Sequence, residues 1–274
     1  MRTVQMEYLR PGEIVAERER CSIVYLPIAP LEWHGPAMPF GTDPLMAQAW
    51  AKQAAQRTGG VVMPTVFFGT ERERPSSILA AKGFENPEEL YILGMDVPKN
   101  SMKSFYARED IFALMVREHL RLLAQQGYGL IVIVNGHGAW GQKSTLERLA
   151  IEFTHETASR VMVGFPDITS QGQAPDFGHG TLVETSLLCY LHNEDVALSE
   201  LPPRQVPLKY TDWGIADDSV FSGEKSPGDS VVFDPRDATP TLGERYFNLA
   251  LNHLCEEVET NYNLITENGG NSDV

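Results

Sequence analysis

Acidic and imidazole side chains gather in one short stretch near the start of the chain. Glu32 and His34 follow the apolar run 23–28, and Asp43 comes soon after them. In extended backbone, side chains two residues apart point to the same face, so Glu32 and His34 can reach one cation or two adjacent cations. Carboxylates and imidazoles are common ligands of divalent metals. The stretch therefore predicts a metal site in which Asp43 could bridge.

A second candidate is a histidine that lies between two glycines. His137 follows the apolar run 130–134, and Gly136 and Gly138 let the backbone approach a ligand closely. Taken alone, a histidine in a turn is usually a hydrogen-bonded structural residue. However, ligands of open α/β sheets bind at the carboxyl ends of the strands, and Glu32 and His34 follow another predicted strand. This shared position favours His137 as a ligand or catalytic residue.

A third cluster contains Asp176, His179 and Glu184. Glu184 falls in the first turn of a predicted helix, where a carboxylate can simply complement the helix dipole, an effect of about 0.3–1 kcal/mol. It can equally be an oxygen ligand of a cation, and position alone does not separate the two interpretations. The pooled clusters supply carboxylates and imidazoles but no thiolates, which favours zinc, manganese or iron over calcium. Two metal ions are more natural for this set than one.

Alternating helices and strands are predicted to position these residues. The first strand covers 23–28, and Thr42 or Asp43 is expected to cap a helix that ends at Gly59-Gly60. The further expected elements are strands at 61–68, 130–134 and 161–165, helices at 109–126, 142–158, 183–192 and 242–260, a long polar excursion at 69–100, and a Pro-rich acidic stretch at 202–240. Helix–strand alternation of this kind indicates an α/β fold with parallel crossovers. We predict one domain over 1–260 and a loose tail over 261–274.

The overall composition limits the classes of partner. The chain has 274 residues, is 42% apolar and carries a formal net charge of −15, without a basic cluster of the kind that nucleic acid or anionic membrane attracts. Three irregularly spaced cysteines predict neither a disulfide framework nor a thiolate zinc site. No apolar stretch is long enough to predict a membrane span or a secretory leader, so a cytoplasmic location is expected. A dinucleotide enzyme is not indicated, since no GxGxxG follows a strand.

In combination, the ordered motifs resemble those of the creatininase (creatinine amidohydrolase) family. The first motif runs from Leu26-Pro27 through Glu32-x-His34-Gly35-Pro36 to Gly41-Thr42-Asp43, the second is 135–138, the third is His179-Gly180 through Glu184-Thr185-Ser186, and a weaker match covers 234–244. The resemblance implies a creatininase-like α/β/α sandwich with a mainly parallel central sheet. It also implies a homo-oligomer, with a hexamer as the assembly to expect, and a dinuclear site holding zinc, manganese or, as a further option, iron.

The resemblance also implies roles for individual residues. Glu32 and His137 would hold one metal, His34 the other, and Asp43 would bridge them, with Glu184 as a further ligand of the second metal. Creatininase itself has a glutamate two residues after the second-motif histidine, whereas this chain has Ala139 there. That departure favours Glu184 as the ligand and argues against creatinine as the substrate. His179 would transfer protons, oriented by Asp176.

The expected activity is hydrolysis of a small, cyclic carbonyl substrate by water that two metals activate. Hydrolysis of an amide C–N bond is the first interpretation, and ring-opening C–C hydrolysis of a cyclic diketo-polyol is the alternative. A protein that keeps a metal for stability and only binds a ligand is a third possibility. Lys99, Lys103 and Trp140 are candidate substrate contacts, although exposed lysines and buried aromatics more often have no such role.

Overall fold

A five-stranded parallel sheet lies at the centre of the computed structural model, which describes residues 2–81, 83–94, 96, 102–165, 168, 178–206, 208 and 234–269. Its strands run in the order β2-β1-β6-β7, and β3 pairs with the carboxyl end of β1. Their bounds are β1 Ile23–Ala29, β2 Val61–Val62, β3 Val66–Phe67, β6 Leu130–Asn135 and β7 Arg160–Gly164. Because every pairing is parallel, the carboxyl ends of β1 and β6 lie side by side.

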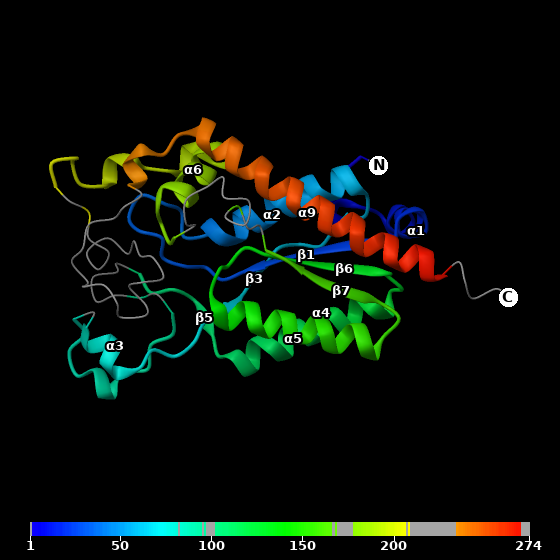
Figure 1. The fold of residues 1–274 in the computed structure, drawn as a ribbon, viewed down its shortest axis with the longest axis horizontal. Coiled ribbons are helices and arrows are strands. Elements are labelled where there is room, and N and C mark those ends of the chain that lie inside the picture. Colours follow the sequence, from blue (N-terminus) through cyan, green and yellow to red (C-terminus); the bar gives the residue numbers. More distant parts are fainter. Residues whose placement is uncertain are drawn as a thin grey trace.

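Helices cover both faces of this sheet, as Figure 1 shows. One face carries α2, α6 and α9, and the other carries α4 and α5. The bounds of the longer helices are α1 Pro11–Arg20, α2 Thr42–Thr58, α4 Glu109–Gln125, α5 Trp140–Glu156, α6 Leu182–Leu191 and α9 Pro240–Gly269. Short 3-10 turns complete the main body: η1 Met6–Tyr8, η3 Asn193–Asp195, η4 Leu198–Glu200 and η5 Pro235–Asp237. The predicted α/β/α sandwich with a mainly parallel sheet is confirmed.

The two central strands feed both layers of the core. In β6, Leu130, Val132 and Val134 pack with α2, α6 and α9, whereas Ile131 and Ile133 pack with α4 and α5. Successive side chains of a strand point to opposite faces, so a strand that is covered on both sides has to be apolar throughout. All positions of β1 and β6 are buried. This explains why the sequence shows them as continuous apolar runs.

The segment 68–107, which contains the predicted stretch 69–100 and is called the excursion from here on, has a small sheet of its own. Strands β4 (Gly69–Thr70) and β5 (Tyr106–Ala107) pair in parallel. In the sequence, α3 (Ser76–Ala81) and η2 (Pro87–Glu89) come between these two strands. The backbone of Phe105 pairs with Leu31, just after β1, through an isolated antiparallel bridge. The excursion therefore returns to the carboxyl end of β1, within the first motif.

Three expected boundaries were wrong. The strand predicted at 61–68 is divided into β2 and β3, and Pro64, which has no N–H for a sheet ladder, lies between them. The cap of α2 is Gly41, so Thr42 and Asp43 lie inside the first turn. The closing helix also extends through Gly269 instead of ending near residue 260.

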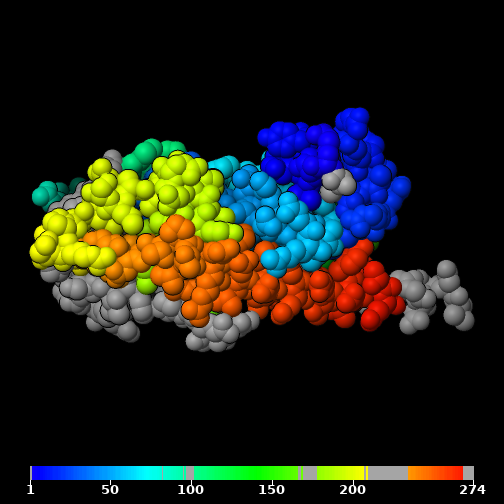
Figure 2. Space-filling model, turned by 90° about the horizontal axis from the view of Figure 1, so that it is seen from above, coloured from blue at the N-terminus to red at the C-terminus, as the bar shows by residue number. Residues whose placement is uncertain are grey.

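The longer α9 changes the expectation of a loose tail over 261–274. Tyr262 and Ile265 pack against the core, and the Tyr262 hydroxyl accepts a hydrogen bond from Ser22 N at 3.2 Å. Residues 261–269 are thus helical and attached to the body, and 270–274 lie outside the described residues. Figure 2 shows α9 lying along the surface beside α6 and α2. Within the described part of the chain, no helix is both long and apolar enough to cross a membrane.

Candidate metal centre

The residues of the three sequence motifs meet at the carboxyl ends of β1 and β6. Glu32 and His34 follow β1, His137 follows β6, Asp43 lies in the first turn of α2, and Glu184 lies in the first turn of α6. Together with His179, these side chains are all buried, each with less than a tenth of its surface exposed. A cluster of buried acids and imidazoles is thus assembled from segments far apart in the sequence.

Asp43 lies between two groups of possible ligands. Its Oδ2 is 2.9 Å from His137 Nδ1, and its Oδ1 is 3.0 Å from His34 Nε2. One group of potential ligand atoms contains Glu32, Asp43 and His137, and another contains His34, Asp43 and Glu184. Each oxygen of Asp43 therefore faces a different group. That arrangement is the one a bridging carboxylate needs.

The two oxygens of Glu32 face different neighbours. Oε2 is 3.0 Å from His137 Nδ1 and 3.7 Å from His34 Nε2. Oε1 accepts a hydrogen bond from the Tyr106 hydroxyl and is 3.8 Å from His179 Nδ1. Oε2 is therefore directed at His137 and His34, whereas Oε1 faces Tyr106 and His179.

Local hydrogen bonds fix the loop that carries His137. The Asn135 side chain donates to the His137 carbonyl at 2.8 Å and accepts from the His137 N–H at 3.1 Å. Gln142 in turn donates to Asn135 Oδ1 at 2.8 Å. Gly136 is required here because a Cβ would lie 2.3 Å from the Asp43 carbonyl oxygen. The loop and the start of α2 are thus held in direct contact.

Glu184 combines the two roles that its position in the sequence allows. It lies in the first turn of α6, where a carboxylate complements the helix dipole. Its Oε2 accepts a hydrogen bond at 2.5 Å from Gly180 N, which lies before the helix begins. The same oxygen is 3.7 Å from His34 Nε2, and the side chain belongs to the group that contains Asp43. A position in the first turn of the helix is thus compatible with a place in the cluster for Glu184.

His179 lies against the other side of His34, with 4.3 Å between the two ring centroids. Its Nε2 lies 2.7 Å from the backbone carbonyl of Trp33 and must carry the hydrogen of that bond, because a carbonyl only accepts. Nδ1 is then the unprotonated nitrogen of the neutral ring, and it faces Glu32. His179 also lies within reach of Glu32 and His34 as a third possible ligand group.

Burial and mutual charge strongly perturb this cluster. Burial opposes ionisation of Glu184, and the carboxylates of Asp43 and Glu32 add to that effect and raise the pKa of Glu184 to about 8. Burial also opposes protonation of His34, but Asp43 and Glu184 outweigh it and raise the pKa of His34 to about 10. Burial lowers the pKa of His179 to about 4, despite the opposing effect of Glu32. Three carboxylates packed this closely repel one another, so nearby positive charge is needed to stabilise their ionised forms.

The ion pairs of the three carboxylates and an unpaired nitrogen of His34 fit a site for divalent metal ions. Within the described part of the chain, every ion pair of Glu32, Asp43 and Glu184 is with a histidine. His34 Nε2, although near Asp43, has no contact of hydrogen-bond geometry to a described residue. Ligand atoms that are each about 2.1 Å from one ion lie about 3–3.4 Å apart, close to the shorter spacings observed. The residues present therefore fit two neighbouring divalent metal ions bound by carboxylates and imidazoles.

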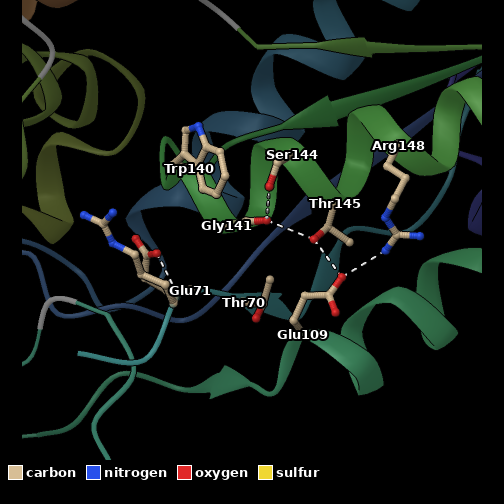
Figure 3. A pocket seen from close by; sticks show the side chains of 9 residues that line it. Thr70, Glu71, Glu109, Trp140, Gly141, Ser144, Thr145 and Arg148 are labelled. Carbon is tan, nitrogen blue, oxygen red and sulfur yellow. Dashed lines mark hydrogen bonds and ion pairs between the residues drawn. The ribbon is translucent and has the colours of Figure 1, made fainter. Parts of the chain in front are cut away.

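The structure does not bring every predicted site residue to this cluster. Asp176 and Lys99 lie outside the described residues. Lys103 is exposed. Trp140, which is 72% exposed, lines a separate cavity of about 410 Å³ beside the start of α5, with Glu71, Arg148 and others around it (Figure 3). None of the cluster residues lines that cavity. A substrate contact for these lysines and Trp140 stays a prediction.

Sequence reasoning missed the residues of the excursion that surround the cluster. Tyr106 donates to Glu32, and Ser104 Oγ accepts from Trp33 N at 3.1 Å. Both residues stand in a segment with no motif of its own. Only its return to the main sheet, which the sequence does not reveal, brings them to the site.

A family model matches most of the chain. The model of the family described as "Creatininase: Creatinine amidohydrolase" matches residues 7–83 and 94–258. The chain belongs to the creatininase family. The members of this family are metal-dependent hydrolases, so the resemblance found in the motifs and the expectation of an enzyme are confirmed.

A curated relative and several solved structures resemble the chain over most of its length. The mycofactocin precursor peptide peptidase of Mycolicibacterium smegmatis is 24% identical over 86% of this chain and 84% of its own. A creatinine amidohydrolase (creatininase) crystal structure superposes with a TM-score of 0.66 at 19% identity, covering 96% of this chain and 99% of its own. A manganese form of creatininase gives a TM-score of 0.66 at 20% identity, covering 95% and 99%. At this identity the solved structures show the fold alone.

Proposed function

We propose that this creatininase-family protein hydrolyses an amide C–N bond at a centre of two divalent metal ions. The observation that carries the proposal is the position of Asp43, whose two oxygens face separate ligand groups. Glu32, Asp43 and His137 would hold one ion, and His34, Asp43 and Glu184 the other. This is the ligand set that the resemblance of the motifs implies. Glu184 takes the place of the glutamate that creatininase has two residues after the second-motif histidine, where this chain has Ala139.

The chemistry divides between the ions and the side chains of the chain. When bound, two divalent ions supply Lewis-acid activation of water and of a substrate carbonyl. His179 faces the centre with Nδ1, the nitrogen that is free to accept a proton. It can take the proton from the attacking water and pass it to the departing nitrogen, which leaves as an amine. Trp33 holds the ring in the orientation that this transfer requires.

An amide bond is favoured over the C–C bond by the names of the related proteins. The description of the family model names an amidohydrolase, and the name of the curated relative is that of a peptidase. Both terms denote enzymes that cleave a C–N bond. We therefore propose a small amide, either a cyclic amide or the end of a short peptide. Creatinine is not the expected substrate, because Ala139 departs from creatininase. C–C cleavage remains an outcome that the substrate screen can reveal.

Zinc and manganese are the ions that we propose, with iron as a further option. The donor set of carboxylates and imidazoles suits these borderline ions, and the related solved structures include a manganese form and a zinc form of creatininase. A homo-oligomer, a hexamer by resemblance, and a cytoplasmic location stay predictions. Light scattering of the purified protein tests the first, and cell fractionation tests the second.

The decisive experiment pairs elemental analysis with turnover. We expect about two divalent ions per chain in protein purified without chelator, and hydrolysis of cyclic amides or short peptides that chelation abolishes and metal restores. Cyclic keto-polyols belong in the same screen, since turnover of these alone would overturn the assignment of an amide bond. Absence of bound metal and of metal-dependent turnover would overturn the proposal as a whole and favour a ligand-binding protein.

A further inference from the structure

A segment of the excursion runs antiparallel along the residues of the first motif and contacts three of them in succession. Phe105 N donates to the Leu31 carbonyl at 2.8 Å, and Trp33 N donates to Ser104 Oγ at 3.1 Å. Between these two contacts, the Tyr106 hydroxyl donates to Glu32 Oε1. The segment 104–106 is thus fastened to 31–33 on both sides of the glutamate.

The position of Tyr106 is itself fixed by its neighbours. Its backbone pairs with Gly69 in β4, and its ring packs against Gly94, where a Cβ would lie 2.2 Å from a ring carbon. Ser104 is held in turn by Asp96, whose Oδ1 accepts from Ser104 N at 3.0 Å and from Ser104 Oγ at 2.9 Å. The hydroxyl of Tyr106 therefore has a defined place, fixed by contacts with other residues of the excursion.

This contact separates the tasks of the two oxygens of Glu32. The oxygen that Tyr106 holds, Oε1, faces Tyr106 and His179, whereas Oε2 lies 3.0 Å from His137 Nδ1. A tyrosine keeps its proton at neutral pH, since its ordinary pKa is about 10, so it acts as a donor to a carboxylate. The other neighbour of Oε1 is His179 Nδ1, which lies 3.8 Å away and beyond hydrogen-bond distance, so without the Tyr106 hydroxyl no hydrogen bond from a described residue would hold this oxygen.

We propose that Tyr106 is a positioning residue for the metal centre: it fixes the Glu32 carboxylate so that Oε2 alone is presented to the ion shared with Asp43 and His137. This inference rests on the metal site of the proposed function and adds a role for the excursion. Hydrogen-bonded partners of metal ligands typically change metal affinity about 10–100-fold when they are removed. The polar excursion thus contributes directly to the centre, although none of its described residues is among the proposed ligands.

The test uses Tyr106→Phe, which removes one oxygen and keeps the ring. Zinc affinities of the metal-free protein are measured by competition with a chromophoric chelator at constant pH. We expect one of the two affinities to fall about tenfold or more, the other to change little, and the visible spectrum of the cobalt-loaded protein to change. Tyr91→Phe is the matched control, because Tyr91 lies in the same excursion with 57% of its surface exposed.

A second variant reaches the same hydroxyl indirectly. Gly94→Ala should displace the Tyr106 ring and weaken the same metal affinity, and thermal unfolding of the metal-free variants shows whether the fold is kept. If both variants fold and bind two zinc ions with the affinities of the unmodified protein, the role of Tyr106 is refuted while the metal centre stands. If the unmodified protein binds no zinc, the proposed function itself fails, and the inference with it.

Discussion

The imidazole of His179 is hydrogen bonded to the backbone carbonyl of Trp33, the residue between Glu32 and His34, with 2.7 Å between Nε2 and the oxygen. A backbone carbonyl cannot change its identity by substitution, so this contact fixes the tautomer of His179 in any variant that keeps the local fold. The same short segment therefore orients two predicted ligands and the predicted proton carrier.

Replacing His179 by alanine should separate proton transfer from metal binding. We expect kcat to fall about 10²–10⁴-fold, the usual contribution of a positioned acid or base, with about two ions per chain retained. Elemental analysis and steady-state kinetics check the two parts. His192→Ala is the control, since His192 is partly exposed and pairs with Asp195 rather than with the centre. Loss of an ion from His179→Ala would instead identify His179 as a ligand.

Replacing Glu184 by glutamine should empty one of the two metal positions. The amide keeps the size of the side chain and can still accept a hydrogen bond from Gly180 N, but it lacks the charge that His34 and the ion require. We expect metal content near one ion per chain and activity reduced at least about 100-fold, as for loss of a metal-site residue. Glu194→Gln is the control, because Glu194 belongs to an exposed cluster near α6. Retention of both ions would refute a ligand role and leave Glu184 with the hydrogen bond from Gly180 and the helix dipole.

The sequence was sufficient for those parts of the site that depend on local pattern. A strand that is covered on both faces is an apolar run, and site residues gather at the carboxyl ends of such strands. The positions of Glu32, His34 and His137 at the ends of β1 and β6 could therefore be predicted directly. Tyr106 could not, because its contact depends on how the excursion returns to β1, a long-range pairing with no local signal. The extension of α9 past residue 260 was missed for a similar reason: Tyr262 and Ile265 are anchored by packing against distant parts of the core.

The crossing of α6 and α9 depends on a glycine in α9. A Cβ at Gly243 would lie 1.8 Å from the Ser186 carbonyl oxygen, and a backbone atom cannot move away as a side chain can. Gly243→Ala should therefore lower the free energy of unfolding by about 1–3 kcal/mol, as overpacking does, which urea denaturation measures. Gly12→Ala in α1 is the contrast, since no atom lies within 4 Å of its added methyl group. That variant should gain about 0.4–1 kcal/mol through the unfolded chain, and equal losses in both would contradict the packing argument.

Glu17 should make stability depend on pH far from the metal centre. It is buried, and its Oε1 accepts from Gly60 N at 2.9 Å, while its Oε2 accepts from Arg20 Nε at 2.8 Å. Burial opposes ionisation of Glu17, but the Arg20 guanidinium and the Gly60 N–H outweigh it and lower its pKa below the ordinary value. The folded state thus binds this proton less readily than the unfolded state does. The stabilisation is complete above the unfolded pKa of about 4.3 and is lost as the pH falls through the lower folded pKa.

The Glu17→Gln variant tests this directly in metal-free protein kept in chelator. At pH 7 the free energy of unfolding of the variant should be lower by about 1 kcal/mol. This is a typical value for a hydrogen bond to a charged group, reduced because the guanidinium of Arg20 is partly exposed to water. The difference from the unmodified protein should shrink steadily below about pH 4. Glu19→Gln, at an exposed position of the same helix, should show no such trend. A difference that stays constant from pH 7 to the acid limit would mean that Glu17 stabilises the fold by packing and not by its charge.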